Sequence, residues 1–277
     1  MKQAFDLTLR TWRATAVRRF FGPSVRALVV RSEIGLFAVD PEDFGVGRKL
    51  RKNGRYGSDE VQRLSPYLSN DSRLLVVGAH IGTLAIPLSR VCREVIAVEA
   101  NPATFELLTM NIALNGAKNC QAIQLAASDK EEMLPFVLNR VNSGGSKRLP
   151  KIDKFMYRYD HPETVQVRAN SLDHQFADRS FRVVVMDIEG SEYFALRGMQ
   201  DILAHCEVLM VEFLPHHLRN VAGVGVTEFL SVIKPHFTRM TIPSQQLVVP
   251  AGGFDNALAA MYERDEGESG LIFDKAP

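Results

Sequence analysis

The alternation of short apolar runs with helical patterns, which begins at Arg73, limits the fold of this chain more than any other feature. Strands are predicted at 73–77, 94–98, 121–125, 182–186 and 207–212, and helices near 83–92, 103–115, 191–201 and 226–234. Residues 237–242 and 257–262 are predicted as the last strands, before an acidic tail. Because consecutive parallel strands need a long crossover that is usually a helix, this order predicts a parallel α/β sheet.

The composition is that of an ordinary globular protein and excludes several other classes. The chain has 277 residues, 46% of them apolar and 23% charged, which argues against disorder, collagen-like repeats and a coiled-coil rod. Its formal net charge of +1 gives no global reason to expect a nucleic acid as partner. Cys92, Cys120 and Cys206 stand in apolar stretches without a CxxC spacing, which argues against disulfides and a zinc site.

The N-terminal 21 residues predict an amphipathic helix. Its apolar side chains recur at spacings of three and four: Phe5, Leu9, Trp12, Ala16 and Phe20. Basic residues dominate this region, so the helix fits an anionic lipid surface. A helix that docks on its own domain or on a second subunit is the commoner alternative in soluble proteins.

A hairpin is predicted after this helix, with strands at 27–30 and 36–39, and a short helix follows at 59–68. We therefore divide the chain into an N-terminal extension, residues 1–54, and a main domain, residues 55–277. The longest apolar runs fall short of a membrane span, and the N-terminus differs from a signal peptide, so the expected location is cytoplasmic.

The segment LLVVGAHIGT, residues 74–83, places a buried strand directly before a glycine turn and the start of a helix. Gly78 permits a tight turn and the close approach of a ligand, and Gly82 lets the helix pack near the strand. A dinucleotide fingerprint requires G-x-G-x-x-G, but Ala79 and His80 stand where it needs glycine. A pyrophosphate-containing cofactor is therefore disfavoured.

The next strand ends at Glu99, about twenty residues after the first glycine, where a carboxylate can accept both hydroxyls of a ribose. An adenosine without a pyrophosphate suits both features, and this combination points to S-adenosylmethionine. The simpler alternative is that Glu99 is an exposed acid at the end of a strand.

The segment VVVMDIEGSE, residues 183–192, is a second predicted binding element. Asp187, Glu189 and Glu192 follow a buried strand at its carboxyl end, which is where ligands bind in open α/β sheets. Such carboxylates can orient an ammonium group, take a proton from an acceptor or hold a divalent cation. Glu192 also falls in the first turn of the next helix, where the helix dipole favours an anion.

Another strand ends with Glu212 and is followed closely by His216 and His217. Either histidine could act as a general base near neutral pH, although a histidine on a surface loop is the simpler interpretation. Residues 138–165 interrupt the alternation with glycines, serines, basic residues and aromatics. We predict a long loop or lid over the acceptor there, because unstructured loops of this length are usually functional or disordered.

Taken in order, these segments resemble the FkbM family of S-adenosylmethionine-dependent methyltransferases. The matching segments run from about residue 55 to about residue 215: GAHIGT, VIAVEANP, NIALN, AASD, NSGGS, SLD, MDIEGSE with the following LRG, and the strand that ends in Glu212. Three positions depart from the family pattern. Val76 stands in place of an acid, His80 in place of an asparagine and Val185 in place of a lysine.

The resemblance implies a class I methyltransferase fold, a Rossmann-like, mostly parallel sheet of seven strands with helices on both faces and an antiparallel last strand. It also implies O-methylation of a sugar or natural-product hydroxyl. The partner is then a small-molecule or glycan acceptor and not a nucleic acid, and the N-terminal helix can add a weak membrane contact or self-association.

The predicted cofactor-binding residues are Gly78, Ala79, His80, Gly82, Glu99, Ala100, Asn101, Ala127 and Asp187. The predicted catalytic residues are Asp187, Glu189 and His216, and no metal ligand is assigned. One alternative is a non-catalytic nucleotide-binding or scaffold relative, which the changes at Val76 and Val185 suggest. The other is an NAD-dependent oxidoreductase, which the absence of a third glycine disfavours.

Overall fold

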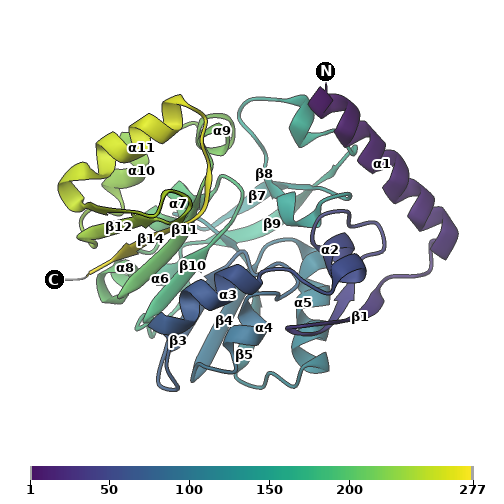
Figure 1. Ribbon diagram of the computed structural model, residues 1–277, viewed down its shortest axis with the longest axis horizontal. Helices are drawn as coiled ribbons and strands as arrows, with labels where there is room; N and C mark the ends of the chain where they lie inside the picture. The colour runs from purple at the N-terminus through teal and green to yellow at the C-terminus, as the bar shows by residue number, and fades with distance from the viewer. Residues whose placement is uncertain (1, 276–277) are drawn as a thin grey trace.

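The structure is a computed structural model that describes residues 2–275, and it is built around one large twisted sheet (Figure 1). The strand order is β13-β12-β14-β11-β10-β3-β4-β5. The bounds are β3 (Arg73–Val77), β4 (Glu94–Glu99), β5 (Cys120–Gln124), β10 (Val183–Met186), β11 (Val208–Phe213), β12 (Arg239–Ile242), β13 (Leu247–Pro250) and β14 (Glu268–Asp274). The five strands from β5 to β11 are mutually parallel, and β14 runs antiparallel between β11 and β12. The predicted class I architecture is confirmed, with β13 as one strand beyond the expected seven.

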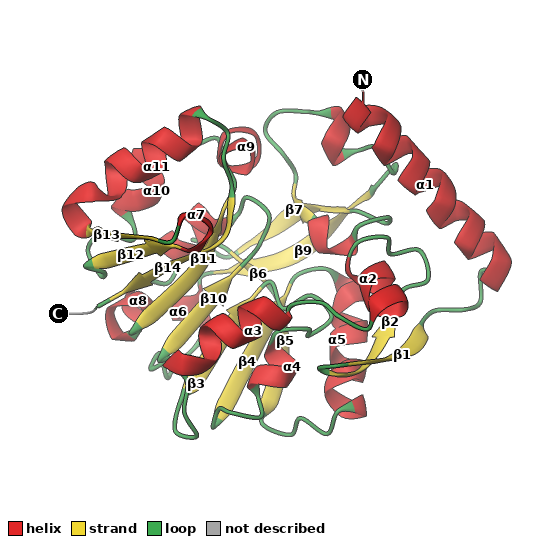
Figure 2. Ribbon diagram, viewed as in Figure 1, coloured by secondary structure: helices red, strands yellow, loops and turns green. Residues whose placement is uncertain are grey.

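Helices cover both faces of the sheet (Figure 2). Their bounds are α2 (Val46–Asn53), α3 (Ser58–Leu64), α4 (Ala85–Leu88), α5 (Pro102–Leu114), α6 (Leu172–Gln175), α7 (Glu192–Arg197), α8 (Gln200–His205), α9 (Pro215–His217), α10 (Val226–Ser231) and α11 (Phe254–Glu263). Successive side chains along a strand point to opposite faces of the sheet, so they belong to two different apolar cores. On β3, Leu74 and Val76 pack with α2 to α5, whereas Leu75 and Val77 pack with α6, α7, α8, α10 and α11.

The prediction of a strand at residues 257–262 is wrong, because this segment belongs to α11. Phe254, Leu258 and Met261 are its buried side chains, and their spacings of four and three are those of a helix. The last strand is β14 instead. The helix predicted at 191–201 is likewise interrupted at Gly198, where a Cβ would lie 2.0 Å from the carbonyl oxygen of Ser128.

A second, smaller sheet lies beside the first and has the order β6-β9-β7-β8. Its strands are β6 (Ala126–Ala127), β7 (Glu132–Leu138), β8 (Lys147–Arg148) and β9 (Glu163–Asn170). The sequence analysis missed this sheet. The predicted lid is largely the connection between β7 and β9, and it contains β8 and short 3-10 helices at Ser143–Gly145 and Phe155–Tyr157.

The predicted hairpin is confirmed as β1 (Leu28–Ser32) and β2 (Gly35–Val39). Two asparagines of α5 bind the free edge of β2. The Asn111 side chain accepts from Ala38 N at 2.6 Å and donates to Ala38 O, and Asn115 does the same with Leu36. Phe37 joins the same core as β3, so the extension and the main domain share one apolar core. Their division at residue 54 stays a prediction.

The predicted N-terminal helix is confirmed as α1 (Lys2–Phe21), which runs along one edge of the molecule (Figure 1). Its predicted apolar face is not docked on the chain's own domain: Phe5, Trp12 and Phe20 are 68%, 69% and 84% exposed. The side that contacts the domain carries the buried Ala14 and the partly buried Arg18, which pairs with Asp40 and Glu42 after β2. Within residues 2–275, no helix is both long and apolar enough to cross a membrane.

Candidate active site

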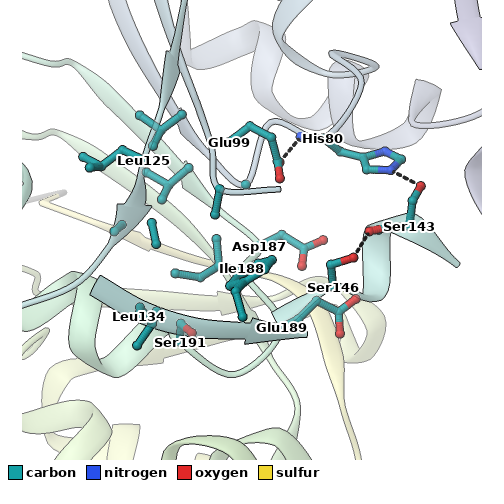
Figure 3. A pocket seen from close by; sticks show the side chains of 18 residues that line it. His80, Glu99, Leu125, Leu134, Ser143, Ser146, Asp187, Ile188, Glu189 and Ser191 are labelled. Atoms are coloured by element: carbon teal, nitrogen blue, oxygen red, sulfur yellow. Dashed lines mark hydrogen bonds between the residues drawn. The ribbon is translucent and has the colours of Figure 1, made fainter. Parts of the chain in front are cut away.

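A pocket opens at the carboxyl ends of β3, β4 and β10, where the small sheet meets the large one (Figure 3). It encloses about 540 Å³ of empty space, part of it open to solvent. The strand ends supply Gly78, Glu99 and Asp187 to its wall, so the structure brings together three residues that the sequence analysis had singled out.

The glycine turn fits tightly against the end of β10. Gly78 has a φ of +85°, and a Cβ there would lie 1.9 Å from the carbonyl oxygen of Asp187. Only glycine therefore allows the turn to come this close. Gly82 has a φ of +91° and makes room for the side chains of Ile86 and Leu108 behind the pocket.

Glu99 is buried, with 8% of its surface exposed, and its carboxylate is held by the backbone. Its Oε2 accepts from His80 N and its Oε1 accepts from Asn101 N, both at 2.8 Å. Burial raises the pKa of Glu99 to about 7, although the backbone hydrogen bonds oppose that shift. The carboxylate is thus fixed in one orientation at the pocket wall, which removes the alternative of an exposed acid.

One end of the pocket is apolar. The side chains there are Leu125, Ala126, Ala127, Leu134, Phe136 and Ile188. Leu134 and Phe136 come from β7, so sequence analysis could not assign them without the second sheet. This end suits a flat, largely apolar group such as a purine ring.

His80 links the glycine turn to the predicted lid. Its Nε2 lies 2.8 Å from Ser143 Oγ, and Ser143 donates its hydroxyl proton to Asp43 Oδ2 at 3.0 Å. Because a hydroxyl group has a single proton, His80 donates through Nε2–H, and its Nδ1 carries the lone pair. His80 has a φ of +51°, and such a conformation is uncommon in a residue with a side chain.

The opposite end of the pocket is acidic. Asp187 is exposed to the open cavity, and loss of solvation among the surrounding protein atoms, followed by the neighbouring Glu189 and Glu192, raises its pKa to about 8. Burial and the same neighbours also raise the pKa of Glu212 well above its usual range. Asp187 directly follows Met186 at the end of β10, and Glu212 directly follows Val211 on β11. Met186 and Val211 are partners across the two strands, so the two acids lie close together.

Glu192 has a structural role in the turn after β10. Its Oε1 accepts from Ile188 N and its Oε2 accepts from Gly190 N, both at 2.9 Å. Burial raises the pKa of Glu192 to about 7 against the effect of these bonds. The carboxylate thus accepts hydrogen bonds from backbone N–H groups at the start of α7. This role agrees with the expectation that the helix dipole favours an acid in the first turn.

Lys147 and His217 face this acidic end. Sequence analysis did not assign Lys147 to the site, and it considered His217 only as a possible general base beside the predicted His216. Lys147 Nζ donates to Glu189 Oε2 at 3.3 Å. His217 Nδ1 lies 3.4 Å from the same oxygen and 3.9 Å from Glu212 Oε2. Burial, with Lys147 and His216 nearby, lowers the pKa of His217 to about 2, so the ring is neutral.

His216, the predicted base, lies beside His217 with ring centroids 4.3 Å apart. It borders a third pocket, which His217, Lys147 and Glu189 also line. Of the two adjacent histidines, His217 is the one with a ring nitrogen close to Glu212, at 3.9 Å.

Two other predicted residues shape the pocket from behind its wall. Asn101 caps α5 by accepting from the backbone of Ala103 and Thr104. Gly82 makes space for packing, as described above. Ala79 borders a second pocket, while Ala100 and Ala127 line the first, as predicted.

The second pocket is larger, with about 2100 Å³ of empty space that includes open solvent. The two pockets share Gly78, His80, Asp187 and Glu189. The rim of the second carries basic side chains from the extension: Arg10, Arg13, Arg48 and Lys49. Asp187 thus stands where the smaller pocket and the larger one meet.

The model of the methyltransferase FkbM domain matches residues 77–240, which is more than half of the chain. The chain belongs to the FkbM methyltransferase family. It is therefore a methyltransferase that uses S-adenosylmethionine as its cofactor. The first pocket fits this cofactor, because an apolar end, a fixed carboxylate and a glycine turn follow one another along its wall.

Two curated relatives are methyltransferases of other kinds. The chain is 26% identical over 126 residues to a probable cobalt-precorrin-6B C(15)-methyltransferase (decarboxylating) of Methanocaldococcus jannaschii, covering 44% of this chain and 68% of that protein. It is 30% identical over 97 residues to a tRNA/tmRNA (uracil-C(5))-methyltransferase of Nitratiruptor, covering 35% of this chain and 25% of that protein. Among solved structures, the FkbM methyltransferase of Methylobacillus flagellatus aligns with a TM-score of 0.44 and 17% identity, over 74% of this chain and 44% of that one.

The FkbM positions that depart from the family pattern lie together in the structure. Val76 and Val185 are paired on the adjacent strands β3 and β10, and both line the second pocket. An ammonium group nevertheless reaches the acidic end of the site, because Lys147 supplies it from β8. Sequence spacing could not assign Lys147 to this end of the site.

Proposed function

We propose that this FkbM methyltransferase transfers the methyl group of S-adenosylmethionine to a hydroxyl group of a small-molecule or glycan acceptor. The observation that carries the proposal is the position of Asp187, whose carboxylate borders both pockets. With a pKa of about 8, its carboxylate form, which can accept the proton of an acceptor hydroxyl, predominates above pH 8.

On this proposal the first pocket holds the cofactor. Glu99 accepts the ribose hydroxyls, since its two oxygens keep lone pairs beyond those used by His80 N and Asn101 N. Leu134 and Phe136 cover the adenine ring from β7. The turn at Gly78 and His80 holds the methionyl part, which places the reacting end towards Asp187.

The acceptor lies in the second pocket on this proposal. When bound, S-adenosylmethionine supplies an electrophilic methyl group on a sulfonium. Asp187 takes the proton of the acceptor hydroxyl while that oxygen bonds the methyl carbon and the carbon–sulfur bond breaks. Alignment of two reactants in this way contributes about 7–11 kcal/mol, so no exceptional base is required.

Charges around the site support these roles. Lys147 holds Glu189 at 3.3 Å, which keeps that carboxylate in place beside Asp187. The basic rim formed by α1 and α2 favours an acceptor with acidic groups. We also propose that residues 55–277 form the catalytic domain and that the extension, residues 1–54, completes the wall of the acceptor pocket.

Product analysis with labelled cofactor tests the proposal. The protein is incubated with S-adenosylmethionine carrying a ¹³C methyl group and with separated small-molecule, glycan and RNA fractions of a cell extract. The carbon chemical shift distinguishes a methoxyl from a methyl on carbon. A labelled methoxyl in a small-molecule or glycan fraction, absent with Asp187→Asn, supports the proposal, whereas label on carbon or in RNA contradicts it.

A further inference from the structure

The acidic end of the site contains a group of three side chains with the composition of a metal centre. Glu189 follows β10, Glu212 lies in β11, and His217 ends the short helix α9. One ligand atom of each lies within 4.8 Å of the others. Because β10 and β11 are adjacent and parallel, their carboxyl ends bring these residues to the same edge of the sheet.

We propose that Glu189, Glu212 and His217 bind a divalent transition-metal cation such as Mn²⁺. This inference rests on the proposed function only for the role of the cation, which is to hold the acceptor hydroxyl beside Asp187 and lower its pKa. The site itself is inferred from geometry and from unpaired polar atoms.

The distances between the proposed ligand atoms suit a small cation if these atoms move slightly closer together. His217 Nδ1 lies 3.4 Å from Glu189 Oε2 and 3.9 Å from Glu212 Oε2. Ligand atoms that are each about 2.1 Å from a metal are separated by roughly 3–3.5 Å when they are neighbours around it. Two carboxylates with one imidazole favour Mn²⁺, Fe²⁺ or Zn²⁺ over Ca²⁺ and Mg²⁺, which prefer oxygen alone.

Two buried atoms of this group make no hydrogen bond of normal geometry with the described part of the chain, although the Glu212 carboxyl also interacts with Asp187. Glu212 Oε2 and His217 Nδ1 are both enclosed by protein and lack a hydrogen-bond partner among residues 2–275. The His217 side chain is only 5% exposed, and its Nδ1 is aimed at both carboxylates. Buried polar atoms are nearly always paired, and a bound cation would satisfy both of these at once.

Several acidic side chains surround this group: Asp187, Glu189 and Glu212 gather here, with the ammonium group of Lys147 beside Glu189. Glu192 adds a fourth carboxyl group, but backbone amides occupy both of its oxygens. A divalent cation bound here would therefore compete with Lys147 for Glu189 Oε2.

Metal binding is measured directly, without any acceptor. The full chain is treated with a chelator and titrated with Mn²⁺, and the free ion is followed by electron paramagnetic resonance. We expect one saturable site per chain. Glu212→Gln should weaken it at least tenfold, and Lys147→Met should tighten it because the competing ammonium group is gone.

Glu207→Gln is the matched control, since Glu207 lies at the other end of the same strand, paired with Arg182 on the surface. It should bind Mn²⁺ as the unchanged chain does. Circular dichroism checks that each variant is folded. No saturable binding by the unchanged chain, or equal binding by a folded Glu212→Gln variant, would overturn the site. Methyl transfer and S-adenosylmethionine binding are measured in other experiments. Failure of the methyltransferase proposal is therefore distinguishable from failure of the proposed metal site.

A second inference rests on helix α1. Phe5, Trp12 and Phe20 form a stripe on its outer face, at 3.6 residues per turn, and all three are mostly exposed. On the same helical projection Arg13 and Arg19, both exposed, flank this stripe on its two sides. The stripe faces outward because Ala14 and Arg18 occupy the opposite side of the helix.

We also propose that this face of α1 lies on an anionic lipid surface. Aromatic side chains between arginines suit the boundary between headgroups and acyl chains, and tryptophan is favoured there. Burial of the stripe against the same stripe of a second copy would bring the flanking arginines of two chains together, at an electrostatic cost. Lipid headgroups with negative charge instead complement them.

Trp12 is the single tryptophan of the chain and reports directly on this contact. We expect vesicles of phosphatidylcholine with phosphatidylserine to shift its fluorescence to shorter wavelength, and vesicles of phosphatidylcholine alone to leave it unchanged. Replacement of Arg13 and Arg19 by glutamate should abolish the shift. The same replacement of the exposed Arg168 and Arg264 should not. Absence of a shift with anionic vesicles, or a shift that needs only a higher protein concentration, would overturn the proposal, the latter in favour of a dimer.

Discussion

The carboxylate of Glu99 accepts a hydrogen bond from the backbone N–H of His80 at 2.8 Å. This bond joins the end of β4 to the glycine turn after β3, so the group proposed to hold the ribose and the turn proposed to hold the methionyl part are fixed relative to each other. The other oxygen of Glu99 accepts from Asn101 N. A pocket organised in this way needs little rearrangement to bind its ligand.

Glu99→Ala should weaken the binding of S-adenosylmethionine by about 1–3 kcal/mol, because hydrogen bonds from the ribose to a charged group are lost. Isothermal titration calorimetry measures the change. Glu94→Ala is the matched control, since Glu94 begins the same strand, lies far from the pocket and pairs with Arg73. Equal affinities of the two folded variants would remove the ribose role from Glu99.

Asp187→Asn should retain cofactor binding and lower turnover about 100-fold or more, since general bases contribute about 10²–10⁴ in rate. The amide has the same shape but cannot take a proton. Transfer of a labelled methyl group, with the cofactor at saturation, measures the effect. Asp153→Asn changes an exposed aspartate and should leave the rate unchanged. Full activity of Asp187→Asn would exclude a role in proton transfer.

The pH dependence of stability should be unusual for carboxylates. Burial raises the pKa of Glu99 from about 4.5 in the unfolded chain to about 7, so the folded state binds this proton more tightly. The resulting stabilisation is present in full below pH 4.5 and is lost as the pH rises through 7. It amounts to roughly 3 kcal/mol, since one pKa unit corresponds to about 1.4 kcal/mol.

Urea unfolding without cofactor, at a series of pH values between 4.5 and 8, measures this loss. Glu192, whose pKa burial also raises to about 7, adds a change of the same sign. Glu99→Ala should reduce the slope, whereas Glu94→Ala should leave it unchanged. The buried His217, whose pKa is lowered to about 2, changes stability in the opposite sense below pH 6.5, so the test is the difference between variants. Equal slopes for the unchanged chain and Glu99→Ala would contradict the raised pKa of Glu99.

Gly78→Ala should destabilise the fold by several kcal/mol and prevent cofactor binding. The left-handed conformation alone costs about 1–2 kcal/mol with a side chain, and the Cβ would lie 1.9 Å from Asp187 O. Gly116→Ala is a useful comparison, because Gly116 has a φ of +59° and open space around it. Gly116→Ala should destabilise the fold only by the cost of the left-handed conformation, and this variant should bind the cofactor normally. Thermal unfolding and calorimetry distinguish the two.

Much of the fold could be predicted because β3, β4, β10 and β11 each contain a continuous apolar run that ends at a glycine or an acidic residue. The second sheet could not. The alternation of β7 is interrupted by Pro135, and its partner β9 is polar on one face, with Val167 and Ala169 buried on the other. The helix α2 was missed because basic residues dominate it and Leu50 is one of its few buried apolar side chains.

The site was predictable only where residues follow strands. Glu99 and Asp187 share an edge of the sheet for that reason, and the sequence shows it. Lys147 and Asp43 reach the site from segments far away in the chain, so no spacing relates them to it. Whether His216 or His217 faces the acids depends on the rotation of the short helix α9, which the sequence does not reveal.

The most direct test of the central claim is a crystal structure of the protein with bound S-adenosylmethionine. We predict the ribose hydroxyls on Glu99, the adenine beside Leu134 and Phe136, and the sulfonium methyl directed at Asp187. A cofactor bound elsewhere, or bound in this pocket with its methyl group turned away from Asp187, would contradict the account.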